Sequence, residues 1–336
     1  MVYLGVTGRN DWSSTLPADN NAYFYPSVNA SFVFTELSAL EDSEVLSFGK
    51  VRASWAQVGR TTDPYQLNFT YPAGTPYNGK PLKSLTNVLP NSELKRELTT
   101  ETEVGAQLRF FDDRFRLDAT LYSRETEDLI QQVSTSRASG FTARSLNAGT
   151  ISNKGVELGL DITPLVSTES FSWDMRLNWS KNVNEVVSLA EGIENLPVAD
   201  DNTPPFGPQI VAREGEELGT FYGTGFATND EGERIVTPNA FATYRATSSN
   251  EVLGSYRPDW TGSASTTFSY NNLSLRVLVD GQKGGQIWSL SNLFGLYSGM
   301  FQETVEGNQR RLGVMPEGAN SAEISPRSMY QGLFGL

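Results

Sequence analysis

The sequence predicts an all-β protein, an antiparallel transmembrane β-barrel with long extracellular loops. Three features predict it: segments of roughly ten residues alternate apolar and polar side chains, short turns alternate with long connections, and aromatic residues gather at segment ends. A strand that crosses an outer membrane needs roughly 9–11 residues, and its side chains point alternately to lipid and to the barrel interior. Each segment therefore has the two faces that a barrel wall requires.

The expected strands run along most of the chain, about ten or more of those in a large plugged barrel. The clearest cover residues 102–110, 115–123, 156–163, 171–180 and 273–280, and residues 2–13, 23–35 and 46–58 begin the same series. In residues 171–180 one row is apolar, because neighbouring side chains on a strand point opposite ways. That row is Phe171, Trp173, Met175, Leu177 and Trp179. Polar rows would face water or one another inside the barrel, such as Lys50, Arg52 and Ser54, or Glu157, Asp161 and Thr163.

The connections separate into two kinds that alternate along the chain. Residues 112–114, 164–170 and 271–272 are tight and rich in turn formers, whereas 59–101, 127–150 and 181–259 are long. All short turns then lie on one side, which in outer-membrane barrels is the periplasm. We expect residues 184–258 to form one long extracellular loop region.

Aromatic residues cluster where a barrel places its interfacial girdles. Phe110, Phe111 and Phe115 flank one short turn, and Phe268 and Tyr270 flank another. Trp12, Tyr23, Phe24 and Tyr25 gather at the opposite end. Core aromatics of a soluble sandwich would also alternate, so a soluble or surface-attached all-β glycan-binding module is the alternative.

Composition excludes several function classes. The formal charge of -13 argues against nucleic acid as a partner, because phosphate binding needs clustered Lys and Arg. The chain has no cysteine and no histidine, so it lacks thiolate metal sites, the usual general base and the commonest metal ligand. No apolar run reaches the length of a membrane helix, roughly 18 residues. We predict no enzyme activity, catalytic residue, cofactor or metal site.

Two loop features suggest contacts of other kinds. Residues 215–223 read GEELGTFYG, and its glycines could present Phe221 and Tyr222 to a ligand or partner, as could Trp260. The other interpretation is a small subdomain in which these aromatics simply pack. Acidic groups at 200–201, 214–217 and 230–233 could hold Ca²⁺ or act as glycosidase carboxylates, but solvated charge explains them as well.

Several strings, in order, resemble the SusC/RagA family of TonB-dependent outer-membrane transporters. They are RNDWSSTLP (9–17), YFYPSV (23–28), LSFGKVRASWAQVG (46–59), NKGVEL (153–158), FSW (171–173), PDWTG (258–262) and DGQKGG (280–285). The resemblance implies that residues 1–336 are part of one such barrel, its C-terminal part, in the cell outer membrane. Because the sequence enters a strand pattern at once, we expect the signal peptide, plug domain and TonB box of such a transporter to lie outside it.

The same resemblance implies a function. The family takes up oligosaccharides or other nutrient oligomers, including peptides, across the outer membrane. A SusD-like surface lipoprotein lids the barrel and captures ligand, and TonB pulls on the plug in the N-terminal part. The expected surroundings of the wall are outer-membrane lipid on one side and a hydrated interior on the other.

Overall fold

The computed structural model describes residues 1–37, 40, 43–198, 207–233, 235, 247, 249–298 and 300–302. Its contacts divide the chain into two compact units. Unit 1 comprises Met1–Leu196, Arg213–Leu218 and Pro258–Gly284, and unit 2 comprises Pro197–Ala212, Gly219–Arg257 and Gly285–Leu336. The two units are described in turn.

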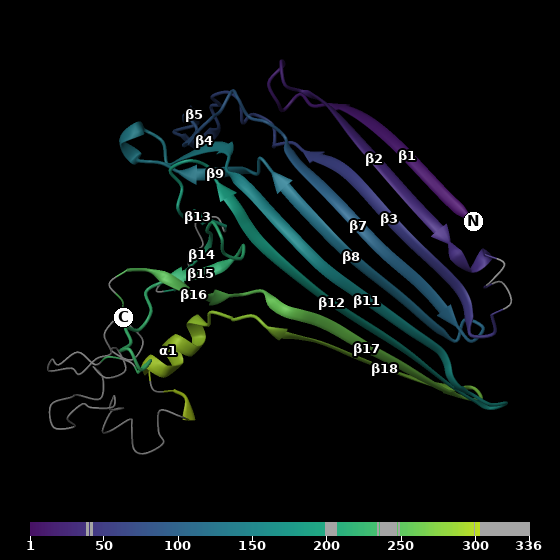
Figure 1. Ribbon diagram of the computed structural model, residues 1–336. Coiled ribbons are helices and arrows are strands. Elements are labelled where there is room, and N and C mark those ends of the chain that lie inside the picture. Colours follow the sequence, from purple (N-terminus) through teal and green to yellow (C-terminus); the bar gives the residue numbers. More distant parts are fainter. Residues whose placement is uncertain are drawn as a thin grey trace. The chain divides into compact units, whose positions relative to one another are not determined.

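Unit 1 is built on one antiparallel sheet of nine long strands (Figure 1). Each strand pairs with its predecessor and its successor in the chain, leaving aside the short strands of the loops. The strands in spatial order are β1 (Val2–Trp12), β2 (Ala22–Val33), β3 (Leu46–Arg60), β7 (Glu97–Phe110), β8 (Phe115–Glu127), β11 (Gly149–Ser167), β12 (Phe171–Leu189), β17 (Pro258–Tyr270) and β18 (Leu273–Gly284). This up-and-down order confirms the predicted wall of an antiparallel barrel, with β1 and β18 at the two edges in this structure.

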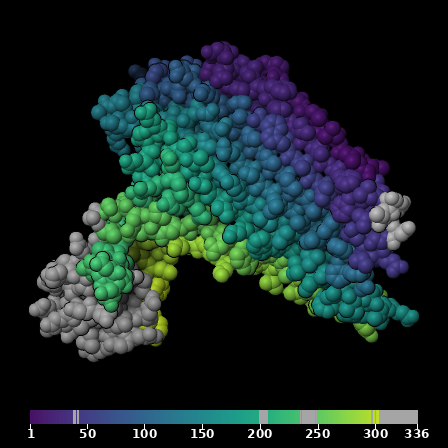
Figure 2. All heavy atoms as spheres, in the orientation of Figure 1, coloured from purple at the N-terminus to yellow at the C-terminus, as the bar shows by residue number. Residues whose placement is uncertain are grey.

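Cross-strand partners lie on the same face of a sheet, and on one face of this sheet the partners are apolar. Val28 pairs with Trp55, Val104 with Leu121, and Leu160 with Leu177. Several large side chains on this face are open to the surroundings: Leu4 is 71% exposed and Leu121 57%. Leaving such a face in water is costly, at about 25 cal/mol per Å² of apolar surface. Figure 2 shows one side of the sheet as a continuous surface that runs from purple to yellow-green strands.

Short turns close the hairpins at one end of the sheet. Phe111, Asp112 and Asp113 adopt positive φ angles of 54°, 53° and 66° between β7 and β8, and Asn271 has φ 50° between β17 and β18. Asp and Asn tolerate this left-handed conformation better than most residues, which is why they occupy the tightest points. A 3-10 helix, η1 (Phe34–Glu36), lies between β2 and β3.

The strands extend further toward the long loops than the alternation predicts. β7 begins at Glu97, whereas the predicted strand began at residue 102, and β12 continues to Leu189, beyond the predicted end at 180. Outside the membrane-facing segment the two faces no longer meet lipid and water, and at the outer end of β12 Asn184 and Val186 are buried by contacts with residues 213–218. The alternation of polar and apolar residues therefore fades while the backbone ladder continues. The wall is therefore taller than its membrane-facing pattern.

Two of the long connections in unit 1 are ordered. The connection after β3 holds β4 (Ala73–Tyr77), β5 (Lys80–Lys83) and β6 (Val88–Leu89). The connection after β8 holds β9 (Ile130–Ser134), η2 (Arg137–Ser139) and β10 (Ala143–Asn147). β6, β10 and β9 form a three-stranded sheet, so the two connections are joined by backbone pairing.

In its described residues, unit 2 contains a small sheet and one helix. β14 (Gln209–Ala212), β15 (Thr220–Gly223) and β16 (Glu251–Ser255) pair in that order, and β13 (Leu196–Pro197) begins the sheet at the boundary of the units. Val211 and Phe221 are buried, as is Leu293 of the helix α1 (Leu290–Ser298). The predicted loop region 184–258 thus begins inside β12 and includes this sheet. The described residues contain no helix long and apolar enough to cross a membrane.

Candidate functional site

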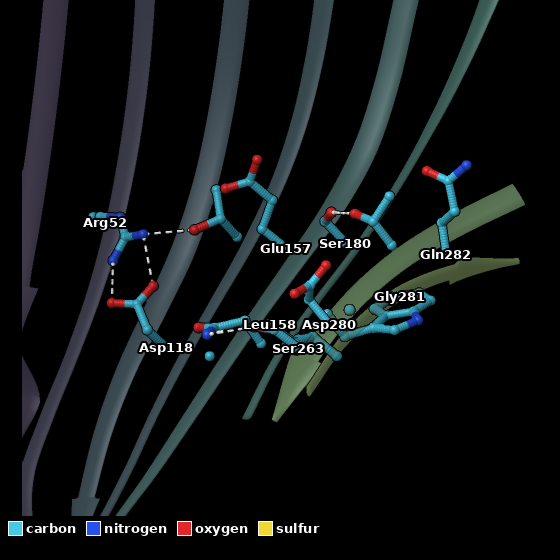
Figure 3. A pocket seen from close by; sticks show the side chains of 15 residues that line it. Arg52, Asp118, Glu157, Leu158, Ser180, Ser263, Asp280, Gly281 and Gln282 are labelled. Carbon is cyan, nitrogen blue, oxygen red and sulfur yellow. Dashed lines mark hydrogen bonds and ion pairs between the residues drawn. The ribbon is translucent and has the colours of Figure 1, made fainter. Parts of the chain in front are cut away.

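A polar hollow lies on the interior face of the nine-stranded sheet. We call it the central hollow; its volume is about 810 Å³. Its lining comes from six strands of unit 1, from β3 across to β18, shown in Figure 3. The lining residues are Arg52, Asp118, Thr120, Glu157, Leu158, Gly159, Asn178, Trp179, Ser180, Thr261, Gly262, Ser263, Asp280, Gly281 and Gln282.

Arg52 of β3 ties three strands together in this hollow (Figure 3). Its guanidinium donates to both carboxylate oxygens of Asp118 on β8, at 3.2 and 2.9 Å. It also donates to Glu103 Oε1 of β7 at 3.3 Å and to Thr120 Oγ1 at 2.6 Å. Such a bidentate arrangement fixes the position of the fork-shaped guanidinium.

Space for this arginine is supplied by a glycine on the neighbouring strand. Gly105 is the cross-strand partner of Arg52, and a Cβ atom at Gly105 would lie only 2.7 Å from Arg52 Cζ. Any larger residue would push the guanidinium away from Asp118. Because Gly105 has no side chain, the Arg52 side chain can lie close against the backbone of β7.

Hydroxyl and amide groups continue the polar row toward β18. Ser180 and Thr261 share a hydrogen bond of 2.8 Å between hydroxyls, and Asn178 Nδ2 donates to Ser263 Oγ at 3.2 Å. Arg176 pairs with Asp161 on the same face. The interior positions of β17 are all hydroxyl residues: Thr261, Ser263, Ser265, Thr267 and Ser269. Many weak, replaceable contacts of this kind suit a surface along which a solute moves.

The hollow carries more acid than base. Glu157 and Asp280 line it with exposed carboxylates that make no hydrogen bond or ion pair with the described residues. The cation Arg52, in contrast, is fully engaged by Glu103 and Asp118. A second acidic hollow of about 390 Å³ adjoins it and includes Glu101, which pairs with Arg124 at 2.7 Å. The interior face therefore presents negative charge to a solute.

The sequence-predicted rows occupy this face as expected. Arg52 and Glu157 line the central hollow, and Asp161 lies on the same side through its pair with Arg176. The polar row expected for residues 273–280 contains Asp280, and this residue does line the hollow. Sequence reasoning did not name Asp118, which takes part only once the strands are in register. Counting residues forward from the short turn at 112–114 would have placed it in the interior row.

The aromatic cluster at the end of the sheet opposite the short turns divides between the two faces. Trp12 and Phe24 take the apolar row, and Trp12 is 72% exposed. Tyr23 and Tyr25 take the interior row, where the Arg96 guanidinium lies 4.3 and 5.6 Å from their ring centres. For these two tyrosines the girdle prediction is wrong, because alternate residues of β2 must point to opposite sides.

The residues proposed for ligand or partner contact lie in different surroundings. Phe221 and Tyr222 are neighbours on β15 in unit 2; Phe221 is only 7% exposed and Tyr222 is half-buried. Trp260 of β17 is 36% exposed and shares the row of Gly262 and Ala264, opposite the interior hydroxyls. Packing thus occupies most of the Phe221 ring, and Trp260 lies on the apolar face.

The acidic groups considered for calcium or catalysis show local roles where they are described. Asn229 Nδ2 donates to Glu231 at 3.2 Å and to Glu233 at 3.1 Å, and its Oδ1 accepts from both backbone amides, so this group closes a turn. No cluster of three or more potential metal ligands occurs among the described residues. Asp200 and Asp201 lie outside the described residues.

The fold and its two faces define a class: the wall of a transmembrane β-barrel with a hydrated interior. Comparison with known proteins gives the family. The family described as "TonB dependent receptor-like, beta-barrel" matches residues 2–311, and the chain belongs to it. It is an outer-membrane protein, and its resemblance to the SusC/RagA group is confirmed.

Individual relatives agree with this assignment. TonB-dependent receptor P26 of Formosa agariphila is 28% identical over 85% of this chain and 31% of its own length. TonB-dependent receptor SusC of Bacteroides thetaiotaomicron is 30% identical over 55% of this chain and 19% of its own. In fold, the RagAB peptide importer in the closed-closed state superposes with a TM-score of 0.68 at 21% identity, covering 84% of this chain and 31% of that one.

The chain spans about a third of the length of the first curated relatives, 31% and 32%. The reported relatives are named as receptors and importers, not as enzymes.

Proposed function

We propose that this chain forms part of the wall of a TonB-dependent importer that carries oligosaccharides or other nutrient oligomers across the outer membrane. The observation that carries the proposal is the two-faced sheet: an exposed apolar face for lipid and an interior face lined by weak polar contacts. A soluble β-module would have to cover residues such as Leu4 and Leu121, which stand exposed.

The charge of the central hollow supports a preference among cargoes. Glu157 and Asp280 are available to a passing solute, whereas Arg52 is occupied by two carboxylates. Like charges repel in a confined space, so polyanions would pass least readily. Neutral or cationic oligomers fit this face best.

The proposed assembly includes two partners. A SusD-like surface lipoprotein would close the extracellular mouth, and TonB would act through another part of the complete protein. Residues 184–258 are proposed as an extracellular region that meets the lipoprotein or the ligand. Within it, Tyr222 is the better candidate contact than Phe221, because more of its side chain is accessible. Trp260 is proposed as a contact on the outer edge of the wall.

Uptake by intact cells tests the transport function. Cells that lack the complete protein should fail to accumulate a fluorescent neutral oligosaccharide or peptide that the parent strain takes up. A protonophore should abolish accumulation in the parent strain, because TonB is driven by the inner-membrane proton gradient. Equal uptake with and without the protein, across glycans and peptides, would remove the proposal.

Purification tests the assembly. An affinity-tagged complete protein, extracted in mild detergent, should bring down a lipoprotein of the same operon. A double substitution, Phe221→Ala with Tyr222→Ala, should reduce either this recovery or ligand uptake if these rings make contacts. Unchanged recovery and uptake would show that the two rings serve only the packing of the small sheet.

A further inference from the structure

Another hollow lies in unit 1, in the loops after β3 and β8. Its volume is about 580 Å³. We call it the loop hollow; the lining residues that matter here are Pro64, Tyr65, Gln66, Asn68, Tyr71 and Gln132. Except for Gln132 on β9, all come from the connection after β3.

The loop hollow is held in shape by contacts between the two connections. Gln66 anchors the first connection: its side-chain Oε1 accepts from Ser145 Oγ at 3.1 Å, and its backbone oxygen accepts from Asn91 N at 3.1 Å. The rings of Phe69 and Phe141 stack with centroids 5.8 Å apart. A site built in advance loses little conformational freedom when a ligand binds.

Two tyrosine rings stand open at this hollow. Tyr65 is 81% exposed and Tyr71 64%. Tyr65 has a φ angle of 70°, in the left-handed region that large side chains seldom adopt. Such backbone conformations persist where the rest of the structure holds them, and they concentrate at binding sites.

The polar groups of the loop hollow are all uncharged. None of its lining residues is acidic or basic, although the chain contains 39 acidic and 26 basic residues. The side-chain amides of Asn68 and Gln132 make no hydrogen bond with any described residue, so their donors and acceptors are available. The hollow thus offers aromatic faces and amides without charge.

We propose that the loop hollow is a surface binding site for a neutral oligosaccharide. A pyranose ring has a C–H face that packs on an aromatic ring and a rim of hydroxyls that both donate and accept, as amides do. A sulfated or carboxylated glycan would find no cation here. The proposal rests on the proposed import function for its role, which is to capture cargo at the extracellular side of the wall.

Binding to the complete purified protein in detergent tests the site. The probes are neutral hexasaccharides of glucose, mannose, galactose and xylose, a hexagalacturonate as the anionic probe, and an uncharged proline-rich decapeptide. The test variant combines Tyr65→Asn with Tyr71→Ala; asparagine tolerates the left-handed φ of position 65. The control is Tyr77→Ala, because Tyr77 of β4 is 68% exposed but does not line the hollow.

At least one neutral hexasaccharide should bind, and the double variant should weaken that binding by about tenfold or more, the loss expected for two stacking rings. Tyr77→Ala should bind as the parent does, and Tyr71→Trp should retain binding because it keeps a ring. The proposal is overturned if no neutral hexasaccharide binds, if the double variant binds equally well, or if only the hexagalacturonate or the peptide binds.

Two measurements separate this site from the import function. Heat-dependent mobility on gels checks that the double variant still forms the folded barrel. Uptake by cells that lack the protein tests import: a normal uptake there refutes the import function, whatever the binding result. If those cells lose uptake but the double variant binds glycan as well as the parent, the import function stands and the loop hollow is refuted as a binding site.

Discussion

At the scale of single residues, the interior face is organised by a few cross-strand pairs. Arg52 is 28% exposed and contacts side chains of both β7 and β8. Charge pairs open to water contribute little each, because solvent screens them and the side chains lose freedom. The value of Arg52 lies in neutralising two carboxylates that would otherwise repel each other across the strands.

Replacement of Arg52 by Met should therefore destabilise the barrel modestly, by about 1 kcal/mol. The measurement is the temperature at which the complete protein loses its compact mobility on unboiled gels. Combining Arg52→Met with Asp118→Asn should recover part of the loss, since it removes one uncompensated carboxylate. Arg276→Met is the control, because among the described residues Arg276 makes a single hydrogen bond, to the Ser265 hydroxyl at 3.1 Å, and no ion pair. An equal loss in the control would contradict the explanation.

Two interior glycines of β11 give a second residue-scale prediction. A Cβ at Gly155 would collide with the ring of Tyr122, whereas a Cβ at Gly159 would meet only Asn178 Oδ1, at 3.7 Å. Gly155→Ala should lower stability by about 1–3 kcal/mol as the ring is displaced, and Gly159→Ala should be tolerated. Thermal unfolding of the two variants checks the contrast, and equal midpoints would argue against close packing of Tyr122 on β11.

At the scale of elements, each long strand has two unlike environments. β18 shows this plainly, because Val277 and Leu278 are adjacent, aliphatic and exposed, yet belong to opposite rows. Val277 pairs with Thr266 on the apolar side, and Leu278 pairs with the interior hydroxyl residue Ser265. Hydrophobicity alone does not distinguish them; register does.

Arginine at these two positions should therefore have different effects. Val277→Arg should cost about 2–4 kcal/mol near the middle of the bilayer, whereas Leu278→Arg should cost little because it meets water. The measurement is unfolding in lipid vesicles, with recovery in the outer membrane as a second readout. If Leu278→Arg were the more damaging change, the assignment of the two faces would be reversed.

How well each element could be predicted from the sequence depends on whether its two faces have unlike environments. Residues 115–123 and 171–180 were found because lipid and water impose opposite preferences on alternate residues. The outer ends of β7 and β12 were not found, since lipid and water no longer impose opposite preferences there and loop contacts bury residues such as Val186. Arg52 was placed in an interior row, but its partner Asp118 lies 66 residues away and depends on register. The loop hollow joins segments that have no periodic pattern.

At the scale of the whole molecule, the position of the negative charge bears on which solutes the proposed importer would pass. The chain has a formal charge of -13, and part of that excess lies on the interior face at Glu157 and Asp280. Charge elsewhere on the surface is screened within a Debye length of about 8 Å in physiological salt. Only the interior carboxylates are close enough to act on a solute within the hollow.

Neutralising those two carboxylates should change selectivity more than overall uptake. Glu157→Gln with Asp280→Asn should raise uptake of an anionic oligosaccharide a few-fold, roughly the effect of removing two partly screened charges, and leave a neutral one unchanged. Glu93→Gln with Glu169→Gln changes net charge equally but outside the central hollow, and should alter neither rate. Matching effects of the two pairs would attribute selectivity to net charge instead.

The length of β11 and β12, 19 residues each, has a consequence for how cargo arrives. At a rise of about 3.3 Å per residue and a tilt near 40°, such a strand climbs roughly 48 Å, about twice the height of the hydrocarbon band. If these strands extend outward from the membrane, the entrance of the barrel would lie well above the plane of the lipid headgroups. In the proposed importer, a bulky polymer would then dock on this rim while its trailing end stays in free solution, clear of crowded neighbouring proteins.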